Sequence, residues 1–258
     1  MATIYAITNQ KGGVGKTTTS VNLAAGLAAA KRRILLIDMD PQGNATSGSN
    51  VDKNELTATT ANLLEGMPLT DCTRWCDAAG YDIVGANSAL TVIEVKMTRE
   101  DNSSFHLREA LKQTDHYDYV LLDCPPTLNT LTMNALVAAQ GVIIPIQCEY
   151  YALEGLSALV ETIDRISQTA NPRLRIEGVL RTMYDPRNNL ARDVSEQLKV
   201  FFGKELYHTV IPRNVTLAEA PSHGLSIIQY DKTSKGAIAY IELVGEILRR
   251  QKAAAKVG

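Results

Sequence analysis

The sequence has few of the features that mark secreted or membrane-embedded proteins. Its four cysteines, Cys72, Cys76, Cys124 and Cys148, form no paired framework, and this fits a reducing cytoplasm better than an oxidising compartment. No stretch approaches about 18 consecutive apolar residues, which excludes a transmembrane helix of the usual kind. The first residues have neither the basic region nor the cleavage pattern of a secretory signal. We therefore expect a cytoplasmic protein.

The chain also lacks any excess of charge, any internal repeat and any long linker. Its 258 residues include 26 Lys and Arg against 28 Asp and Glu, with 45% hydrophobic and 21% charged residues. These proportions are ordinary for a globular protein and exclude wholesale disorder. A chain of this size buries enough surface to fold without disulfides or a structural metal. We predict one domain over residues 1–258, with a basic, flexible tail over 249–258.

Charge is distributed unevenly along the chain. Residues 1–150 hold 11 basic and 16 acidic side chains, whereas residues 173–258 hold 14 basic and 9 acidic side chains. A basic C-terminal third permits contact with nucleic acid. Ordinary solvated surface charge explains the same composition equally well, so the charge pattern alone does not decide between the two.

Short apolar runs alternate with longer amphipathic segments. We predict strands at residues 3–8, 33–37, 81–85, 119–122, 141–147 and 176–183. We predict helices at residues 17–30, 104–114, 129–140, 153–169, 189–202 and 232–250. Continuous apolar strands separated by helices indicate an α/β fold, with a mostly parallel sheet and helices on both faces. The segment 44–62 is rich in Thr, Ser, Asn and Gly, and we predict a mobile loop there.

The most informative stretch follows the first predicted strand and opens the first predicted helix. It comprises Asn9, Gln10, Lys11, Gly12, Gly13, Val14, Gly15, Lys16, Thr17 and Thr18. Glycines let backbone N–H groups curl around a phosphate, and the helix N-terminus adds partial positive charge. Lys16 can reach the β- and γ-phosphates, and the Thr17 hydroxyl can ligate Mg²⁺. We predict that residues 11–18 bind ATP or ADP.

This segment departs from the strict phosphate-loop pattern G-x-x-x-x-G-K-[ST]. Gln10 stands where that pattern has its first glycine, and a second lysine, Lys11, precedes the glycines. A glycine-rich turn that binds nothing is the alternative interpretation, and the position between strand and helix disfavours it. The variant is the deviant Walker A motif, and it resembles the ParA/MinD class of P-loop ATPases.

Acidic residues follow two of the predicted strands. Asp38 and Asp40 come after 33–37, and Asp123 comes after 119–122. Because the carboxyl ends of parallel strands share one edge of a sheet, these carboxylates should lie beside the glycine-rich segment. We expect Asp123 to hold Mg²⁺ through its water shell, Asp40 to orient the attacking water, and Asp38 to support the Mg²⁺ shell or its loop. Helix capping and turn formation are the alternative roles.

Further segments resemble the chromosomal ParA (Soj) subgroup over essentially the whole chain. They read DMDPQGNAT from residue 38, DCPP from 123, QCEYYALEGL from 147, IPRNV from 211 and EAPSHG from 219. The resemblance implies that ATP holds two subunits face to face, with Lys11 reaching the partner's phosphates as a catalytic residue beside Lys16 and Asp40. It also implies that Pro212 and Asn214 contact the adenine. Without the family, Lys11 is equally well interpreted as a surface lysine beside an anion site.

The resemblance also implies how the nucleotide controls DNA. The ATP dimer would bind double-stranded DNA without sequence preference and so associate with the nucleoid. A ParB-type centromere-binding protein would stimulate hydrolysis, and the ADP form would release the DNA. Because no helix-turn-helix precedes the phosphate loop, we expect no operator-specific binding.

Non-specific DNA binding depends on contacts of Lys and Arg with phosphates. Arg187 lies in a loop before a predicted helix, where the family often places a DNA-contacting arginine. Thr216 stands where many relatives have a basic residue, which removes one expected contact. A single arginine is more often a solvated surface charge than a ligand. The candidates are Arg187, Arg192, Lys199, Lys204, Arg213, Lys232, Lys235, Arg249, Arg250 and Lys252.

Two other functions compete with DNA segregation. A MinD-like ATPase that positions the division machinery needs a membrane-targeting helix, and residues 249–258 lack large apolar side chains apart from Val257. We therefore expect no stable membrane binding. A P-loop enzyme that uses ATP on a small molecule, such as an amide ligase, would show turnover that is indifferent to DNA. The extended C-terminal motifs favour DNA segregation over both.

Overall fold

The computed structural model describes residues 2–150 and 152–254. Its strands are β1 Thr3–Ile7, β2 Ile34–Asp38, β3 Arg74–Cys76, β4 Tyr81–Val84, β5 Tyr119–Asp123, β6 Gly141–Gln147, β7 Arg175–Tyr184 and β8 Leu206–Pro212. Its helices are α1 Lys16–Ala29, α2 Asn44–Gly48, α3 Thr60–Leu64, α4 Leu69–Cys72, α5 Ala89–Met97, α6 His106–Ala110, α7 Thr130–Ala138, α8 Ala152–Thr169, α9 Asn189–Phe202, α10 Val215–Glu219, α11 Ile227–Tyr230 and α12 Lys235–Ala254. Short 3-10 segments are η1 Ser103–Phe105, η2 Leu111–Gln113, η3 Gly203–Glu205 and η4 Ala220–His223.

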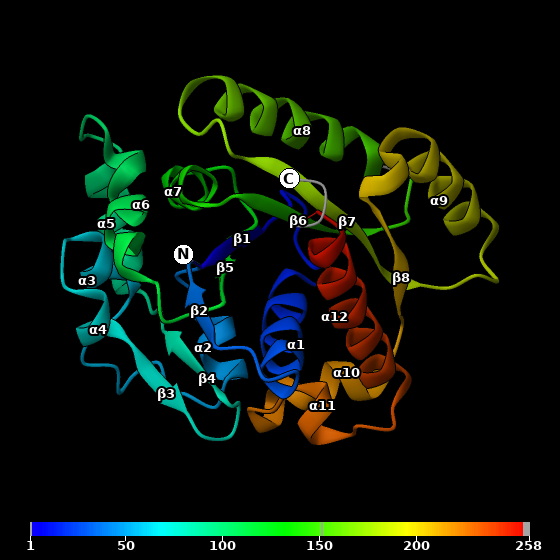
Figure 1. The fold of residues 1–258 in the computed structure, drawn as a ribbon, viewed down its shortest axis with the longest axis horizontal. Coiled ribbons are helices and arrows are strands. Elements are labelled where there is room, and N and C mark those ends of the chain that lie inside the picture. Colours follow the sequence, from blue (N-terminus) through cyan, green and yellow to red (C-terminus); the bar gives the residue numbers. More distant parts are fainter. Residues whose placement is uncertain (1, 151, 255–258) are drawn as a thin grey trace.

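The strands form one sheet in the order β3-β4-β2-β5-β1-β6-β7-β8. All neighbouring strands are parallel except β3 and β4, which pair antiparallel at one edge. Figure 1 shows α7, α8 and α9 on one side of the sheet and α1 and α12 on the other. The predicted α/β class, with a mostly parallel sheet and helices on both faces, is confirmed.

The two faces of the sheet bury two separate hydrophobic cores. In β1, Ile4 and Ala6 belong to the core under α7 and α8, whereas Tyr5 and Ile7 belong to the core under α1 and α12. Successive side chains of a strand point to opposite faces, so a strand covered on both sides must be apolar at every position. This is why the central strands are continuous apolar runs in the sequence.

Close packing of α1 against α12 fixes the position of the phosphate loop. A Cβ added to Gly26 of α1 would lie 2.7 Å from Val244 of α12, so only glycine allows this approach of the two helices. Tyr240 of α12 also shares a hydrogen bond of 3.1 Å with Thr19 of α1. The first turn of α1 is therefore held in place by the last long helix of the chain.

The predicted loop over 44–62 is wrong in part. Residues 44–48 form α2, and α3 begins at Thr60 behind a capping box made by Thr59 and Asn62. Thr46, Ser49 and Thr60 are almost fully buried. The small polar residues that suggested a loop are therefore helix caps and buried hydrogen-bonding groups.

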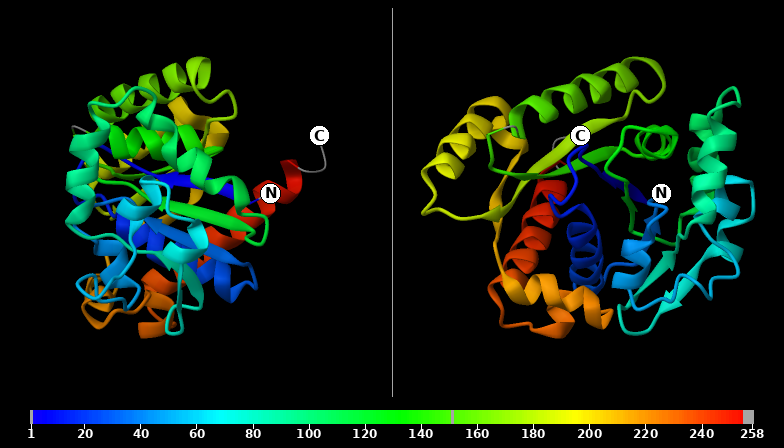
Figure 2. Two further views of the ribbon diagram at one scale, coloured as in Figure 1. Left: turned by 90° about the vertical axis from the view of Figure 1, so that its left-hand side faces the viewer. Right: turned by 180° about the vertical axis from the view of Figure 1, so that it is seen from behind.

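Other differences lie at the edges of the sheet and in short elements. The predicted helix over 104–114 is divided into η1, α6 and η2, while β3, β8 and α5 were not predicted. Strand β8 is an edge strand whose pairing with β7 shifts register, so its pattern is irregular. Helix α12 continues to Ala254 and extends beyond the sheet (Figure 2), so Arg249 and Arg250 lie on a helix rather than in a tail. The rest of that predicted tail, 255–258, lies outside the described residues.

Among the described residues, no helix combines the length and the apolar character that crossing a membrane requires.

Candidate active site

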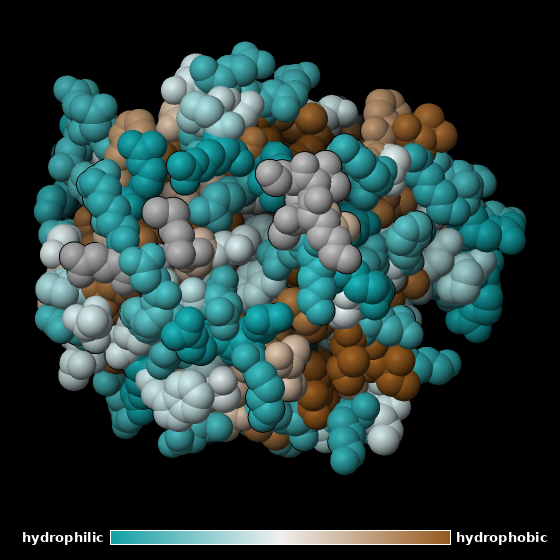
Figure 3. Space-filling model, in the orientation of Figure 1, coloured by the Kyte–Doolittle hydropathy of each residue, from teal (hydrophilic) through white to brown (hydrophobic). Residues whose placement is uncertain are grey.

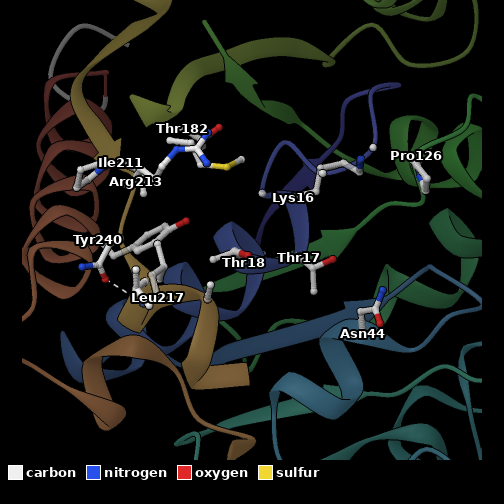
Figure 4. A pocket seen from close by; sticks show the side chains of 18 of the residues that line it. Lys16, Thr17, Thr18, Asn44, Pro126, Thr182, Ile211, Arg213, Leu217 and Tyr240 are labelled. Carbon is white, nitrogen blue, oxygen red and sulfur yellow. Dashed lines mark hydrogen bonds between the residues drawn. The ribbon is translucent and has the colours of Figure 1, made fainter. Parts of the chain in front are cut away.

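A cavity of about 610 Å³ opens at the carboxyl edge of the sheet. Its lining comes from the glycine-rich loop, the loops after β2 and β5, the end of β7, and the segment 211–218 with Tyr240. In Figure 4, Lys16, Thr17, Asn44 and Pro126 lie on one side of the cavity, and Ile211, Arg213, Leu217 and Tyr240 lie on the other. This volume is within the usual range for a small-molecule ligand.

The glycine-rich loop is shaped by its backbone and anchored from β7. Gly13 and Gly15 have φ of 74° and 87°, a left-handed conformation that glycine adopts without strain. Such backbone turns N–H groups to one side and forms an anion-binding concavity. The Thr182 hydroxyl donates to the Val14 carbonyl at 2.7 Å, which ties the loop to the sheet. Val14 itself is fully buried, so its backbone rather than its side chain can serve the site.

Lys16 is buried at the start of α1, with only 7% of its surface exposed. Its Nζ donates to the Lys11 carbonyl at 2.9 Å. Burial lowers the pKa of the Lys16 ammonium, and the nearby Asp123 and Asp40 carboxylates act in the opposite direction. A lysine held at a cavity wall by a single carbonyl is well placed to exchange that carbonyl for a phosphate oxygen.

Asp123 has both carboxylate oxygens bound by hydroxyl groups of α1. Thr17 donates to Oδ2 at 2.8 Å, and Ser20 donates to Oδ1 at 2.7 Å. Burial raises the pKa of Asp123, the neighbouring Asp38 raises it further, and the two hydroxyl groups lower it. Hydroxyl and carboxylate oxygens are the ligands that Mg²⁺ prefers. The adjacent oxygens of Thr17 and Asp123 therefore fit this cation.

Asp38 lies beside Asp123 in the sheet, since these two residues are register partners of β2 and β5. Its Oδ2 accepts from the backbone N–H of Thr46 at 2.8 Å and from the Thr46 hydroxyl at 2.7 Å. Its Oδ1 accepts from the backbone N–H of Asp40 at 3.1 Å. Burial raises the pKa of Asp38, and these hydrogen bonds lower it. Of the two roles predicted for Asp38, these contacts support the organisation of its loop.

Asp40 is carried by that loop to the cavity wall. It is 8% exposed, and its Oδ1 accepts from the backbone N–H of Gln42 at 2.9 Å. A Cβ added to Gly43 would lie 2.5 Å from the carbonyl oxygen of Ala86, and Gly43 has a φ of 64°. The tight turn after Asp40 therefore requires glycine, and it fixes the carboxylate toward the cavity.

The opposite end of the cavity is built around Pro212 and Asn214. The Asn214 Oδ1 accepts from the backbone N–H of Leu217 at 2.9 Å and caps α10. Its amide nitrogen remains the group that can donate to a nucleobase. Met183 also lines the cavity and has a φ of 49°, while the Gln147 amide contacts its sulfur at 3.0 Å. Met183 therefore belongs to the pocket rather than to the core.

Lys11 is separate from the cavity lining. Its side chain is 41% exposed, and its Nζ forms an ion pair with Glu149 Oε2 at 2.5 Å. Its backbone N–H donates to Asn9 Oδ1 at 3.0 Å. The structure thus keeps Lys11 and Lys16 apart, one bound to a carboxylate at the surface and the other buried beside Asp123.

The candidate DNA-binding residues do not gather on one surface. Arg187, Arg192, Lys199 and Lys204 lie on or near α9, which packs on the opposite side of the sheet from α12. Several pair within the chain, with partners Asp185 for Arg187, Asn189 for Arg192, Glu196 for Lys199, Glu205 for Lys204 and Glu246 for Arg250. Arg213, Lys232, Lys235, Arg249 and Lys252 are exposed and have no ion-pair partner among the described residues.

Arg250 is held more firmly than the others. It donates to the Leu206 carbonyl at 2.9 Å and to Glu246 at 2.7 Å, and it lies over the Tyr207 ring. Its side chain is only 23% exposed. We interpret Arg250 as a residue that fastens α12 to β8, and we remove it from the predicted DNA contacts.

Sequence reasoning missed four residues that complete the site. Ser20 follows Thr17 by three positions on the same helix, and this spacing is the one signal that was present in the sequence. Thr46 follows Asp38 by eight positions, whereas Thr182 and Glu149 come from distant segments, with Thr182 holding Val14 and Glu149 holding Lys11 beside the cavity. No local pattern indicates the contacts of Thr182 and Glu149, because the sheet brings these segments together.

Comparisons with known proteins agree with this geometry. A family model described as an AAA domain matches residues 2–176. The chain is 49% identical over 249 residues to the chromosome partitioning protein ParA of Myxococcus xanthus, covering 96% of this chain and 88% of that protein. It is also 49% identical over 245 residues to the chromosome-partitioning ATPase Soj of Thermus thermophilus, covering 95% of each.

Among solved structures, the chain is similar to cobyrinic acid a,c-diamide synthase from Mycobacterium smegmatis, crystallised with an ATP analog and magnesium. The TM-score is 0.86 at 34% identity, with 98% of this chain and 97% of that chain covered. The two folds therefore agree over essentially their full length.

Proposed function

The chain belongs to the ParA/Soj family of chromosome-partitioning ATPases, and we propose that it acts as an ATP-driven switch for DNA segregation. Two copies close around ATP and Mg²⁺ and bind double-stranded DNA without sequence preference. A ParB-type centromere-binding partner stimulates hydrolysis, and the ADP form releases the DNA. The observation that carries this proposal is the Thr17–Asp123 contact beside buried Lys16, at the wall of a nucleotide-sized cavity.

Different residues of the cavity bind the phosphates, the Mg²⁺ ion and the adenine. Lys16 moves its Nζ from the Lys11 carbonyl to the β- and γ-phosphate oxygens, while the N–H groups of residues 12–18 bind the remaining oxygens. Thr17 and Asp123 hold Mg²⁺, which neutralises negative charge on the phosphoryl group that is transferred. Pro212 and Asn214 bind the adenine at the other end of the cavity.

Asp40 orients the attacking water. It is the carboxylate of the β2 loop that lines the cavity, whereas Asp38 is occupied in holding that loop. A positioned group of this kind contributes about 10²- to 10⁴-fold to the rate of a reaction. Lys11 completes the site from the partner subunit, where it stabilises charge on the phosphates in the manner of an arginine finger.

The DNA-binding surface is best supported at the start of α12. Lys232 and Lys235 lie just before and at the start of this helix, and a Cβ on Gly236 would lie 3.1 Å from Asn214 Oδ1, so the segment that carries Arg213 packs beside them. The surface beside these basic residues is apolar. Figure 3 shows a hydrophobic patch where α10 and α12 lie in Figure 1, and exposed Val215 and Ile238 belong to these helices. We call Arg213, Lys232 and Lys235 the α12 basic cluster. This cluster, the exposed Arg249 and Arg187 are the contacts we propose, with the protein associated with the nucleoid in the cytoplasm.

A second function is favoured by one comparison. The likeness to the diamide synthase of M. smegmatis suggests a P-loop enzyme that uses ATP on a small molecule. Such an enzyme would need the phosphate end of the cavity and would have no use for the α12 basic cluster.

Phosphate release in three mixtures separates these functions. We expect slow release by the protein alone and faster release when a random DNA duplex and a ParB-type partner are both present. A rate of phosphate release that does not change with DNA, and that rises only with a small amide-accepting substrate, would favour the synthase-like function. Sedimentation with anionic liposomes under ATP would in turn identify a MinD-like membrane ATPase.

A further inference from the structure

Both lysines of the phosphate loop are bound within one chain, and their contacts are linked. Lys16 Nζ donates to the carbonyl of Lys11, and the side chain of Lys11 is bound to Glu149 at 2.5 Å. The backbone N–H of Lys11 donates to Asn9 Oδ1, and Asn9 Nδ2 donates to the Pro145 carbonyl at 2.8 Å. Lys11 is therefore held to the β6 side of the molecule through its main chain and its side chain together.

Glu149 is well fixed for a surface carboxylate. It follows β6, where its own N–H donates to the Gln147 carbonyl at 2.9 Å and its carbonyl accepts from the Ala152 N–H at 3.0 Å. Its side chain is 50% exposed, and Lys11 is the cation that it pairs with in the described structure. Charge-assisted hydrogen bonds of this type are among the stronger contacts at a protein surface.

We propose that Glu149 is a positioning residue for Lys11, which it holds within its own chain and which it must release when two copies close. The proposal rests on the function proposed above, in which Lys11 reaches the phosphates of the partner subunit. An ammonium group bound to a carboxylate of its own chain is not available to a phosphate of another. The Lys11–Glu149 pair therefore opposes dimer formation, and it does so once in each copy.

The contact between Lys16 and Lys11 connects this pair to the nucleotide. When Lys16 moves its Nζ to the phosphates, it leaves the Lys11 carbonyl and removes one of the contacts that hold Lys11 in place. The remaining restraint on the Lys11 side chain is Glu149. Occupation of the phosphate site thus comes first, and release of Lys11 from Glu149 follows as the copies meet.

The test measures the dimer dissociation constant by analytical ultracentrifugation with ATP and Mg²⁺. All proteins carry Asp40→Ala, so that ATP is not consumed. We expect Glu149→Gln to dimerise at a concentration roughly 2- to 30-fold lower than the parent, because an exposed ion pair is lost in each of two copies. Glu149→Ala should also lower the dimer dissociation constant. Melting curves check that both variants are folded.

Two controls separate positioning from a general effect of charge. Glu65→Gln breaks the comparable surface pair of Lys96 and Glu65, whose atoms lie 2.9 Å apart, and it should leave the dissociation constant unchanged. Lys11→Ala should itself weaken the dimer strongly, because it removes the group that reaches the partner's phosphates, and Glu149→Gln should not strengthen the dimer in that background. A general reduction of negative charge would strengthen the dimer in both backgrounds.

The outcomes separate the role of Glu149 from the proposed function. If the parent dimerises and Glu149→Gln leaves its dissociation constant unchanged or weakens the dimer, the role of Glu149 is wrong while the proposed function stands. An equal gain in the Lys11→Ala background also overturns that role. If the parent binds ATP yet stays monomeric at all concentrations, the dimer itself is refuted, and the role of Glu149 is refuted with it.

Discussion

At the phosphate end of the cavity, Asp123 is fully buried and both of its oxygens accept hydrogen bonds from hydroxyl groups of α1. At the α12 basic cluster, Lys232 and Lys235 extend into solvent without an ion-pair partner in the described structure. Burial of a charged carboxylate is unfavourable unless hydrogen bonds and ion pairs compensate it, so such a group indicates a functional requirement, whereas exposed lysines are ordinary. The buried Asp123 site is therefore strong evidence for phosphate and Mg²⁺ chemistry. The α12 basic cluster is evidence for DNA binding only once that chemistry has been established.

The largest expected effect is at the phosphate end. Lys16→Ala should weaken ATP affinity about 10- to 100-fold, because a hydrogen bond to a charged group contributes about 1.5–3 kcal/mol. It should also reduce hydrolysis to background. Titration with a fluorescent ATP analogue measures the affinity. Lys96→Ala is the matched control, since Lys96 is an exposed lysine that pairs with Glu65 at 2.9 Å. Equal affinities in the two variants would contradict the assignment.

Asp123→Asn should separate function from stability. Hydrolysis should fall about 100-fold, because the carboxylate that we propose holds Mg²⁺ loses its charge. Without metal, the neutral asparagine removes the cost of burying a charge. The melting temperature at neutral pH should therefore rise by about 2–4 °C for each kcal/mol gained in the free energy of unfolding. Burial raises the pKa of Asp123, so the folded state binds its proton more tightly than the unfolded state does. Stability of the parent should therefore decrease as pH rises above the ordinary carboxyl range of about 4. The stability of the variant should decrease less over the same pH range.

A melting temperature that falls in Asp123→Asn at neutral pH would show that the charged carboxylate stabilises the fold. The buried carboxylates would then be structural, and the contrast with the α12 basic cluster would disappear. Differential scanning calorimetry without Mg²⁺ or nucleotide, between pH 5 and 8, measures both the sign and the slope.

Ser20→Ala tests how finely the phosphate end is arranged. Ser20 holds the Asp123 oxygen that does not face Thr17, so its loss should let the carboxylate rotate. Outer contacts of this kind change metal affinity about 10- to 100-fold. We expect the Mg²⁺ concentration that half-saturates ATP binding to rise about 10-fold, with the affinity for ATP in EDTA unchanged. Ser20→Thr retains the hydroxyl and should restore much of the Mg²⁺ response.

The smallest effect is expected at the α12 basic cluster. Lys235→Ala should weaken DNA binding only a few-fold and should lower the slope of log K against log salt by about 0.9, the value for one phosphate contact. Arg250→Ala on the same helix should keep that slope and lower the melting temperature, because Arg250 is bound to Glu246 and to the Leu206 carbonyl. A slope that changes in Arg250→Ala and not in Lys235→Ala would place the DNA elsewhere.

Much of the phosphate end was accessible from sequence, for a physical reason. Its residues follow apolar strands that are buried on both faces, and parallel strands bring their carboxyl ends together, as the pairing of Ile7 and Asp38 with Asp123 confirms. Helix α2 was missed because its Thr and Ser side chains resemble those of a loop, and only the structure shows that Thr46 is buried against Asp38. The partner of Lys11 was missed because Glu149 lies 138 positions away in the chain.

The basic residues of the proposed DNA-binding surface were much less predictable from sequence. Composition identified a basic C-terminal third, yet Arg250 in that third is bound within the fold, to the Leu206 carbonyl and to Glu246. Charge in a sequence does not show which side chains face solvent together. That information depends on packing of α9 and α12 on opposite sides of the sheet.

DNA binding by Asp40→Ala, measured in ATP–Mg²⁺ and in ADP–Mg²⁺ with one random duplex over a salt series, decides whether the nucleotide controls DNA binding. We expect a dimer that binds the duplex only with ATP, and whose affinity falls steeply as salt rises. A variant that binds ATP but stays monomeric and ignores DNA with both nucleotides would contradict it. In that case the α12 basic cluster would be ordinary solvated surface.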